Sequence, residues 1–432
     1  MREAYSDLPT QREIVIGPES ELHPGAHWSL IDEPPPEYRY RPRRAAHVFA
    51  FKQPGCSPYR HFHFGEYLDF GDGDEIVHSS RWPVLRRRSW LVDMDDFNYP
   101  VLIGKHILDP EFRAQYPYDP RGEMGAVVRL RMVMMLAAYL HSSCKGLLFR
   151  SEYALTQAKS VLSRSGLNSE LEAISRKAAV LYPAHRPCSV DQFARKWRDR
   201  DPLQVVFCGR DFETKNGRLA LSVMQRLRQS GAKANFTYIG DIAEDVRTGA
   251  PFLLEGIQHY STLSRHEVLE VLRCAHILFH PSKFEGFGNV LLEAMAAGMA
   301  VVCAVSPDIA HLPEFFSDGG ASVLDRNVVP PDEEEEVFYG YLFDLAAKPE
   351  LSRQKAQRNF EATSKGKFSL ANRDRTLVRF YEAALRQDSP PLQCTDLPCE
   401  AMSFVVFGPA ELAREEYESR KLLNVWDGNF LL

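Results

Sequence analysis

The chain has 432 residues, of which 44% are hydrophobic and 25% are charged, a composition typical of folded globular proteins. This length predicts about two to three domains of ordinary size. Its 52 basic and 58 acidic side chains give a formal net charge of −6. That balance argues against a protein built chiefly to bind nucleic acid, because such proteins carry a strongly basic surface.

The N-terminus and the cysteines bear on the compartment. Residues 1–13 are polar and lack the apolar core of a signal peptide. The longest apolar stretch, residues 132–140, is too short to span a bilayer. Two of the eight cysteines, Cys208 and Cys303, lie in apolar strand-like runs, which indicates buried free thiols in a reducing compartment. We expect a cytoplasmic protein, and peripheral contact with a membrane stays open.

The second half of the chain alternates short apolar runs with longer helical patterns. Such alternation is typical of a parallel sheet covered by helices on both faces. One helix start is marked by Ser264 and Glu267, which have the spacing of a capping box. We predict strands over 204–208, 235–239, 277–280 and 301–305, and helices over 216–229, from 264 onward and over 289–297.

The first half shows a looser version of the same alternation, so we expect a second parallel sheet there, with a cleft between the two domains. We predict strands over 13–16, 46–51, 75–78, 90–92, 146–149 and 179–182, and helices over 124–140, 153–163 and 170–177. The expected organisation is an N-terminal domain over 1–185, a polar linker over 186–203, a C-terminal domain over 204–370, a closing helix over 371–387 and an extension without an assigned role over 388–432.

The strongest chemical signal lies in residues 279–304. A strand ends, a loop carries Glu285 and two glycines, and a helix begins near Asn289. Small residues let a ligand approach the backbone, and a helix N-terminus offers N–H groups that can donate to ligand oxygens. Glu293 lies one turn inside this helix in an otherwise apolar run, where it either caps its own helix or accepts from ligand hydroxyls.

This stretch closely resembles the EX7E signature of the retaining glycosyltransferases of family GT4. The matching residues are Pro281-Ser282, Glu285-Gly286-Phe287-Gly288, Glu293-Ala294-Met295-Ala296 and Gly298. The resemblance implies the GT-B fold, an α/β architecture of two Rossmann-like parallel-sheet domains that face each other across a cleft. It also implies that the C-terminal domain binds a nucleotide-diphosphate sugar and that the N-terminal domain provides the acceptor side.

A second element follows the strand at 204–208. The diphosphate of the donor is an anionic leaving group, so its developing charge must be met by cations or a metal. Gly209-Arg210 and Lys215 resemble the Gly-Arg and Lys-Gly pair of the family, with Asn216 as one extra residue before the glycine. Arg210 can form a fork to two phosphate oxygens, and Lys215 can supply a point charge.

The resemblance assigns roles to these residues. It implies Arg210 and Lys215 on the leaving diphosphate, Glu285 near the transferred sugar and Glu293 on the ribose hydroxyls. The remaining donor-binding candidates are Gly209, Gly286, Phe287, Gly288 and Asn289, whose backbone would surround the diphosphate and sugar, with Pro313 and Glu314 shaping the pocket for the base.

The acceptor side matches the family poorly over residues 1–140. Asp95 and Asp96 follow the predicted strand at 90–92, where relatives often carry a His-Asp pair. A carboxylate there could bind a sugar hydroxyl or take the proton of the acceptor; the alternative is an acidic loop at a strand end. The metal-binding Asp-x-Asp pattern occurs at 93–95 but also at 72–74 and 199–201, so we assign no metal site and no cofactor.

Two arginine-rich stretches, 39–44 and 81–88, contain aromatic residues. Their arginines either lie in exposed loops or recognise an anionic acceptor or an acidic membrane surface.

The expected function is transfer of a sugar from a nucleotide-diphosphate sugar to a small-molecule, glycan or glycolipid acceptor, with retention of anomeric configuration and without a metal. Two alternatives stay open: a non-catalytic subunit that binds sugar nucleotides, and a nucleotide-sugar epimerase of the GT-B type. The sequence does not identify the base, the sugar or the acceptor.

Overall fold

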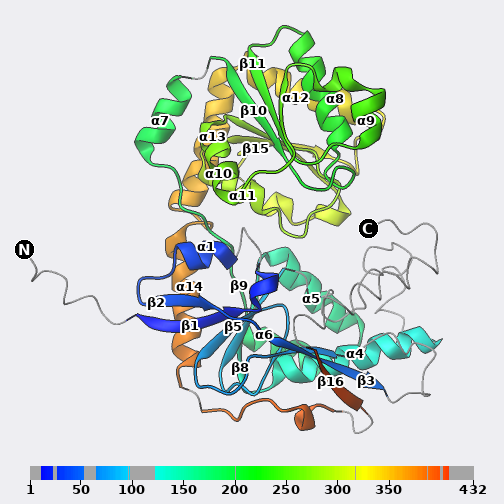
Figure 1. The fold of residues 1–432 in the computed structure, drawn as a ribbon, viewed down its shortest axis with the longest axis vertical. Helices are drawn as coiled ribbons and strands as arrows, with labels where there is room; N and C mark the ends of the chain where they lie inside the picture. Colours follow the sequence, from blue (N-terminus) through cyan, green and yellow to red (C-terminus); the bar gives the residue numbers. More distant parts are fainter. Residues whose placement is uncertain are drawn as a thin grey trace, which may run out of the picture. The chain divides into compact units, whose positions relative to one another are not determined.

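The computed structural model describes residues 11–22, 27–52, 65–95, 97, 122–199, 201–316, 318–386, 388–398 and 402–407. The predicted site residue Asp96 lies outside these residues. The chain divides into two units (Figure 1). Unit 1 draws on 1–23, 30–181 and 376–432, and unit 2 on 24–29 and 182–375.

Unit 2 contains a six-stranded parallel sheet in the order β12-β11-β10-β13-β14-β15. Helices lie on both faces of this sheet (Figure 1). The strands are β10 (Leu203–Cys208), β11 (Ala234–Ile239), β12 (Ile257–Tyr260), β13 (Ile277–His280), β14 (Ala300–Val305) and β15 (Ala321–Asp325), and the helices are α7 (Val190–Arg198), α8 (Gly217–Gln229), α9 (Glu244–Gly249), α10 (Arg265–Cys274), α11 (Asn289–Ala296), α12 (Glu334–Ala347) and α13 (Pro349–Ser364).

Local signals define the helix ends of unit 2. Ser264 and Glu267 form the predicted capping box at the start of α10: the Ser264 Oγ accepts from the Glu267 N–H, and the Glu267 carboxylate accepts from the Ser264 N–H. Gly298 follows α11 with φ +71° and so supplies the left-handed conformation that ends the helix. The predicted capping box is confirmed.

The stretch 186–203, which we expected as a linker, contains helix α7 within unit 2. Its Phe193 and Trp197 are buried in the core of this unit. The Nζ of Lys196 donates to the backbone oxygens of Ala275 and Ala297 at 2.8 and 2.5 Å, which places a cation at the C-terminal ends of α10 and α11. The sequence did not predict this helix, because two apolar residues in a polar stretch are too few to show a helical period.

Unit 1 contains a second six-stranded parallel sheet, in the order β2-β1-β5-β7-β8-β9. Together the two sheets confirm the predicted α/β class with two Rossmann-like parallel-sheet domains. The strands are β1 (Arg12–Gly17), β2 (Tyr38–Pro42), β5 (Ile76–Ser80), β7 (Trp90–Met94), β8 (Cys144–Phe149) and β9 (Ala178–Val180), and the helices are α4 (Gly122–Leu140), α5 (Glu152–Arg164) and α6 (Asn168–Lys177). Two more helices, α1 (His27–Asp32) and α14 (Leu370–Ala384), have residues in both units.

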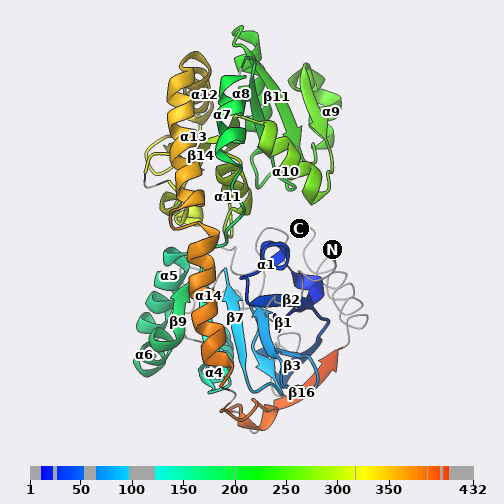
Figure 2. The same ribbon diagram turned by 90° about the vertical axis from the view of Figure 1, so that its left-hand side faces the viewer.

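Alternate residues of β1 enter two different cores. Ile14 packs with Leu377 and Tyr381 of α14, and Val15 packs in the core formed with α4 and α5. This alternation follows from the two-residue period of a strand. Figure 2 shows α14 running along its face of the sheet. None of the helices in the described part of the chain is both long and apolar enough to cross a membrane.

The C-terminal stretch completes another sheet of unit 1, in the order β16-β3-β4-β6. Strand β16 pairs antiparallel with β3, so that Phe404 lies opposite Ala50. The predicted strand at 46–51 therefore exists, but it does not belong to the parallel sheet. The four strands are β3 (Ala46–Lys52), β4 (Gly65–Asp69), β6 (Val84–Leu85) and β16 (Met402–Phe407).

A chain of hydroxyl and imidazole groups joins α14 to the sheet of unit 1. The Tyr381 Oη lies 2.7 Å from the His78 Nδ1 and 2.9 Å from the Tyr40 Oη. Both Tyr381 and His78 are fully buried. Because a buried polar group that loses its partner keeps its desolvation cost, this contact should stabilise unit 1.

We expect Tyr381→Phe to lower the free energy of unfolding by about 1–3 kcal/mol, since the phenyl ring fills the same space without the hydroxyl. Equilibrium urea denaturation measures the change. Tyr339→Phe is the matched control: no described residue bonds its hydroxyl, and its expected change is within about 0.5 kcal/mol. Equal effects of the two substitutions would contradict the role of the Tyr381 hydroxyl.

Candidate active site

Two loops come together at the carboxyl ends of β10 and β13. The Lys283 N–H donates to the Thr214 oxygen at 2.8 Å, and the Ser282 Oγ donates to the Phe284 oxygen at 2.8 Å. From beyond β15, Arg326 donates to the oxygens of Ser282 and of the preceding Pro281, at 2.6 and 2.8 Å. These bonds hold loop 281–288 against the loop that carries Lys215.

Glu285 lies at the centre of the site. Its Oε1 accepts from the Lys215 Nζ at 2.6 Å and lies 2.8 Å from the His280 Nε2. Burial raises the pKa of the Glu285 carboxyl, but the charges of His280 and Lys215, with their hydrogen bonds, outweigh burial and lower this pKa to about 2. Glu285 is therefore an anion throughout the physiological range and can only accept hydrogen bonds there.

The predicted site glycines differ in the space around their Cα atoms. A Cβ on Gly209 would lie 2.6 Å from the Lys215 Cγ, so the glycine lets the stem of Lys215 cross the strand end. A Cβ on Gly286 would meet no atom within 4 Å. Gly288, at φ +83°, is the N-cap of α11 and precedes Asn289, its first residue. The structure thus presents the N-terminus of α11 beside Glu285.

Two aromatic residues brace the loop from the core side. The Phe287 ring is buried and packs against Phe315, with ring centroids 5.1 Å apart. The Nε2 of His311 donates to the Phe287 oxygen at 3.1 Å, and burial lowers the pKa of His311. Phe287 therefore contributes its backbone to the site, whereas its side chain anchors the loop.

Glu293 lies on α11 and pairs with a residue of α10. The Arg265 Nη1 donates to the Glu293 Oε1 at 2.8 Å. Burial raises the pKa of the Glu293 carboxyl, and the Arg265 charge opposes that rise. Of the two interpretations left open for Glu293, the structure does not show a cap of its own helix; Glu293 forms an ion pair between helices, and its contact with ligand hydroxyls stays a prediction.

The other donor-side residues differ in their surroundings. Arg210 is exposed just after β10 and makes no hydrogen bond or ion pair with any residue that the structure describes. Pro313 is exposed. The Glu314 Oε2 accepts from the Tyr182 Oη at 2.9 Å, and Lys367 donates to the Glu314 backbone oxygen. The Glu314 carboxylate is thus already engaged within unit 2.

Asp95 in unit 1 is part of an ion-pair network. Arg81 donates to both of its carboxylate oxygens, at 3.2 and 3.1 Å, and the Arg150 Nη1 lies 3.5 Å from the Asp95 Oδ2. Burial raises the pKa of Asp95, but Arg150 and Arg81 lower it to about 2. Such a carboxylate is a weak base at neutral pH, so the structure favours the acidic strand-end alternative over the proton acceptor.

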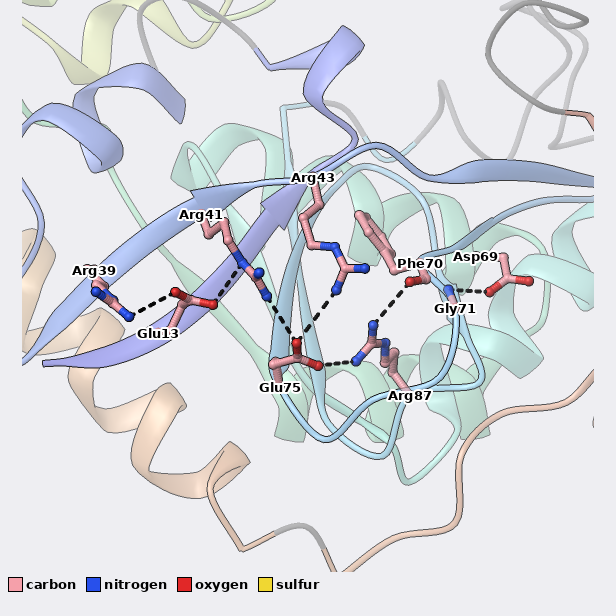
Figure 3. A network of polar contacts seen from close by, with 9 residues as sticks. All are labelled: Glu13, Arg39, Arg41, Arg43, Asp69, Phe70, Gly71, Glu75 and Arg87. Carbon is pink, nitrogen blue, oxygen red and sulfur yellow. Dashed lines mark hydrogen bonds and ion pairs between the residues drawn. The ribbon is translucent and has the colours of Figure 1, made fainter.

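The arginine-rich stretches are also engaged in ion pairs. Glu75 lies 3.0 Å from Arg41, 3.6 Å from Arg43 and 2.6 Å from Arg87 (Figure 3). The Arg87 side chain is fully buried and also donates to the Phe70 oxygen. Arg41, Arg43 and Arg87 thus share one carboxylate, and recognition of an anionic acceptor or membrane by these stretches stays a prediction. In the part of the chain described, no group of three or more His, Cys, Asp or Glu side chains is placed to hold a metal ion.

Sequence reasoning missed four residues of this site. His280, Arg265, Arg326 and His311 contact Glu285, Glu293, loop 281–288 and Phe287, respectively. Only His280 had a signal, a polar residue in an apolar strand next to the motif. The other contacts depend on which helices and loops pack together.

Known proteins agree with this reading of unit 2. Residues 190–357 match the family model described as "Glycosyl transferases group 1". The gpi3 subunit of phosphatidylinositol N-acetylglucosaminyltransferase from Schizosaccharomyces pombe is 27% identical over 121 residues, which cover 27% of this chain and 26% of that protein. An uncharacterized 41.2 kDa protein of the Klebsiella pneumoniae cps region is 29% identical over 125 residues, which cover 29% and 33% of the two chains.

Among solved structures, a UDP-forming α,α-trehalose-phosphate synthase from Burkholderia vietnamiensis has a TM-score of 0.48 and 12% identity, with 73% of this chain and 72% of that chain covered. The aligned part spans about a third or less of the curated relatives. The family match thus lies within unit 2, over residues 190–357. The family resemblance drawn from the sequence is confirmed.

Proposed function

We propose that the protein is a retaining, metal-independent glycosyltransferase of the GT4 type that uses a nucleotide-diphosphate sugar. One observation carries the proposal: the anionic carboxylate of Glu285, held by Lys215 at 2.6 Å, stands beside the N-terminus of α11. This arrangement combines an acceptor for sugar hydroxyls with backbone donors and a cation for an anionic leaving group.

The proposed roles follow from charge and position. Glu285 accepts a hydrogen bond from a hydroxyl of the transferred sugar and carries no proton to the reaction. Arg210 and Lys215 bind the diphosphate, and Arg210 is exposed with its fork available. Glu293, steadied by Arg265, accepts from the ribose hydroxyls, and the N–H groups of residues 287–289 surround the sugar.

Retention is proposed to proceed on one face of the sugar. The bond from the anomeric carbon to the donor phosphate oxygen breaks, and the acceptor oxygen forms the new bond on that same face. The proton of the acceptor passes to the departing phosphate oxygen, so no protein nucleophile is needed.

The acceptor is proposed to be a small molecule, a glycan or a glycolipid. The name of the S. pombe relative describes a phosphatidylinositol N-acetylglucosaminyltransferase subunit, which supports testing glycolipids first. A cytoplasmic location with peripheral membrane contact would suit such an acceptor.

A thermal-shift screen over UDP-glucose, UDP-N-acetylglucosamine, GDP-mannose and ADP-glucose tests the proposal. A donor at 100 times its dissociation constant should stabilise the protein by about 2.7 kcal/mol. Release of the nucleoside diphosphate in step with transfer to an acceptor supports the transferase. Tight binding without turnover on any acceptor supports a non-catalytic subunit, and conversion of the donor sugar without an acceptor supports an epimerase. No stabilisation by any donor contradicts all three.

A further inference from the structure

A cavity of about 680 Å³ lies at the amino edge of the sheet in unit 2. Its lining includes Leu203, the first residue of β10, and Lys233, which directly precedes β11. The donor loops instead follow the last residues of β10 and β13. Because a strand the length of β10 spans about 17–20 Å, the cavity is separate from the candidate active site.

The inner wall of this cavity is apolar. Trp197 of α7 and Leu203 are both buried and belong to the core of unit 2. The indole N–H of Trp197 donates to the Gly298 oxygen at 3.0 Å, which fixes the ring. Ala346 of α12 and Pro349 of α13 also line the cavity. Its volume and apolar wall are typical of sites for small organic molecules.

Three cationic side chains line the same cavity. They are Arg198 at the end of α7, Lys233, and Arg353 of α13. The lining contains one carboxylate, that of Asp201. Three cations and one carboxylate give the lining a net charge of +2, whereas the whole chain carries −6. A local excess of positive charge on an acidic protein favours an anionic ligand.

These cations are available to a ligand. Arg198 is exposed, and its side chain makes no hydrogen bond or ion pair with any residue that the structure describes. Lys233 pairs with Asp201 at 3.3 Å, and Arg353 pairs with Glu350 at 3.7 Å. All four of these paired side chains are more than half exposed. Exposed ion pairs contribute little to stability, so a ligand can replace them.

We propose that this cavity binds an organic phosphate ester, whose apolar part packs against Trp197 and whose phosphate binds Arg198 and Arg353. Each guanidinium can donate two parallel hydrogen bonds to phosphate oxygens. A soluble phosphate ester and the headgroup of an anionic phospholipid share this chemistry. The site goes beyond the proposed function, because it lies at the other edge of the sheet and does not require a donor to bind.

Calorimetry with phenyl phosphate tests this site in the full chain. Inorganic phosphate should bind about 10-fold or more weakly than phenyl phosphate, because it lacks the ring that the apolar wall buries. Arg198→Gln should weaken binding of phenyl phosphate by about 10-fold, through loss of a charged hydrogen bond. Ala194 is an exposed residue of α7 that lines the cavity, and Ala194→Trp should block binding without changing the charge.

Two variants are controls. Arg195 is another exposed arginine of α7, and it does not line the cavity. Arg195→Gln should leave the affinity for phenyl phosphate within about 2-fold. Lys215→Ala removes a proposed donor-binding cation at the opposite edge of the sheet. It should also leave this affinity within about 2-fold, which separates the cavity from the donor site.

Cosedimentation with vesicles of phosphatidylcholine and phosphatidic acid distinguishes the two sources of the phosphate. Sedimentation that Arg198→Gln reduces indicates a lipid headgroup, whereas calorimetric binding without sedimentation indicates a soluble ester. The inference would be overturned if the wild-type protein bound neither phenyl phosphate nor the vesicles, or if Arg198→Gln and Ala194→Trp left binding unchanged. Failure of the donor screen would instead contradict the proposed function, since none of the proposed donor-binding residues lines this cavity.

Discussion

Replacement of Glu285 by glutamine is expected to lower kcat for sugar transfer by about 10²–10³-fold, the range observed when one preorganised electrostatic contact to a transition state is removed. Glutamine keeps the volume of the side chain but removes the negative charge that Lys215 and His280 hold in place. Affinity for the nucleoside diphosphate should change by less than about 3-fold, because the diphosphate does not contact this carboxylate in the proposed complex. Release of nucleoside diphosphate in the presence of acceptor gives kcat.

Glu270→Gln is the matched control for the loss of one glutamate charge. Glu270 lies on α10, is half-exposed and pairs with Arg273 outside the site. Its substitution should leave kcat within about 2-fold. A Glu285→Gln enzyme that keeps turnover within about 3-fold of wild type would remove Glu285 from the reaction.

Replacement of Arg150 by methionine is expected to destabilise unit 1 by about 3–5 kcal/mol, the cost of leaving a buried charge without its partner. The Arg150 side chain is 2% exposed, and its Nη2 lies 3.2 Å from the Asp93 Oδ2, whose side chain is 5% exposed. Its Nη1 also lies near Asp95, which Arg81 continues to bind. Equilibrium urea denaturation, followed by a probe in unit 1, measures the loss.

Two further variants make this prediction specific. Arg176→Met removes an exposed arginine of α6 and should change the stability by less than about 0.5 kcal/mol. Adding Asp93→Asn to Arg150→Met removes the buried charge itself and should recover part of the loss. An Arg150→Met protein within about 1 kcal/mol of wild type would contradict the buried ion pair.

The same network predicts acid sensitivity of unit 1. The pKa of Asp95 is about 2 in the folded protein, below its ordinary value of 3.8. A carboxyl group whose pKa is lowered by folding stabilises the folded protein at pH values above its ordinary pKa. This stabilisation is lost as the pH falls toward the pKa of the folded state. For Asp95 we expect a loss of about 2 kcal/mol between roughly pH 4 and pH 2. Asp95→Asn should flatten this part of the stability profile, measured by urea unfolding at each pH; a profile unchanged from wild type would contradict it.

Much of the donor side could be predicted because its parts are near one another along the chain. Strand β13, the glycine-containing loop and α11 follow in direct succession, and each has its own local signal. Placing Lys215 beside Glu285 needed one more rule, that neighbouring parallel strands end at the same edge of a sheet. The 2.6 Å contact between these side chains agrees with that reasoning.

Contacts between distant segments could not be predicted in the same way. Arg265 and Arg326 lie on elements whose own patterns are those of ordinary solvated helices and loops. Their partners, Glu293 and loop 281–288, depend on how α10 and β15 pack in unit 2. Asp95 likewise had two readings until its pairing with Arg81 and Arg150 was known.

The sequence by itself determined the succession of strands and helices, the parallel sheet of unit 2 and the strand–loop–helix that carries Glu285, because periodicity, caps and glycine positions act within a few residues. Only the tertiary structure decided that β16 completes a sheet with β3, that Arg41, Arg43 and Arg87 share Glu75 and that His280 lies beside Glu285. Pairing across long stretches of chain depends on the total packing of each unit, in which charge compensation and burial select partners that no local pattern records.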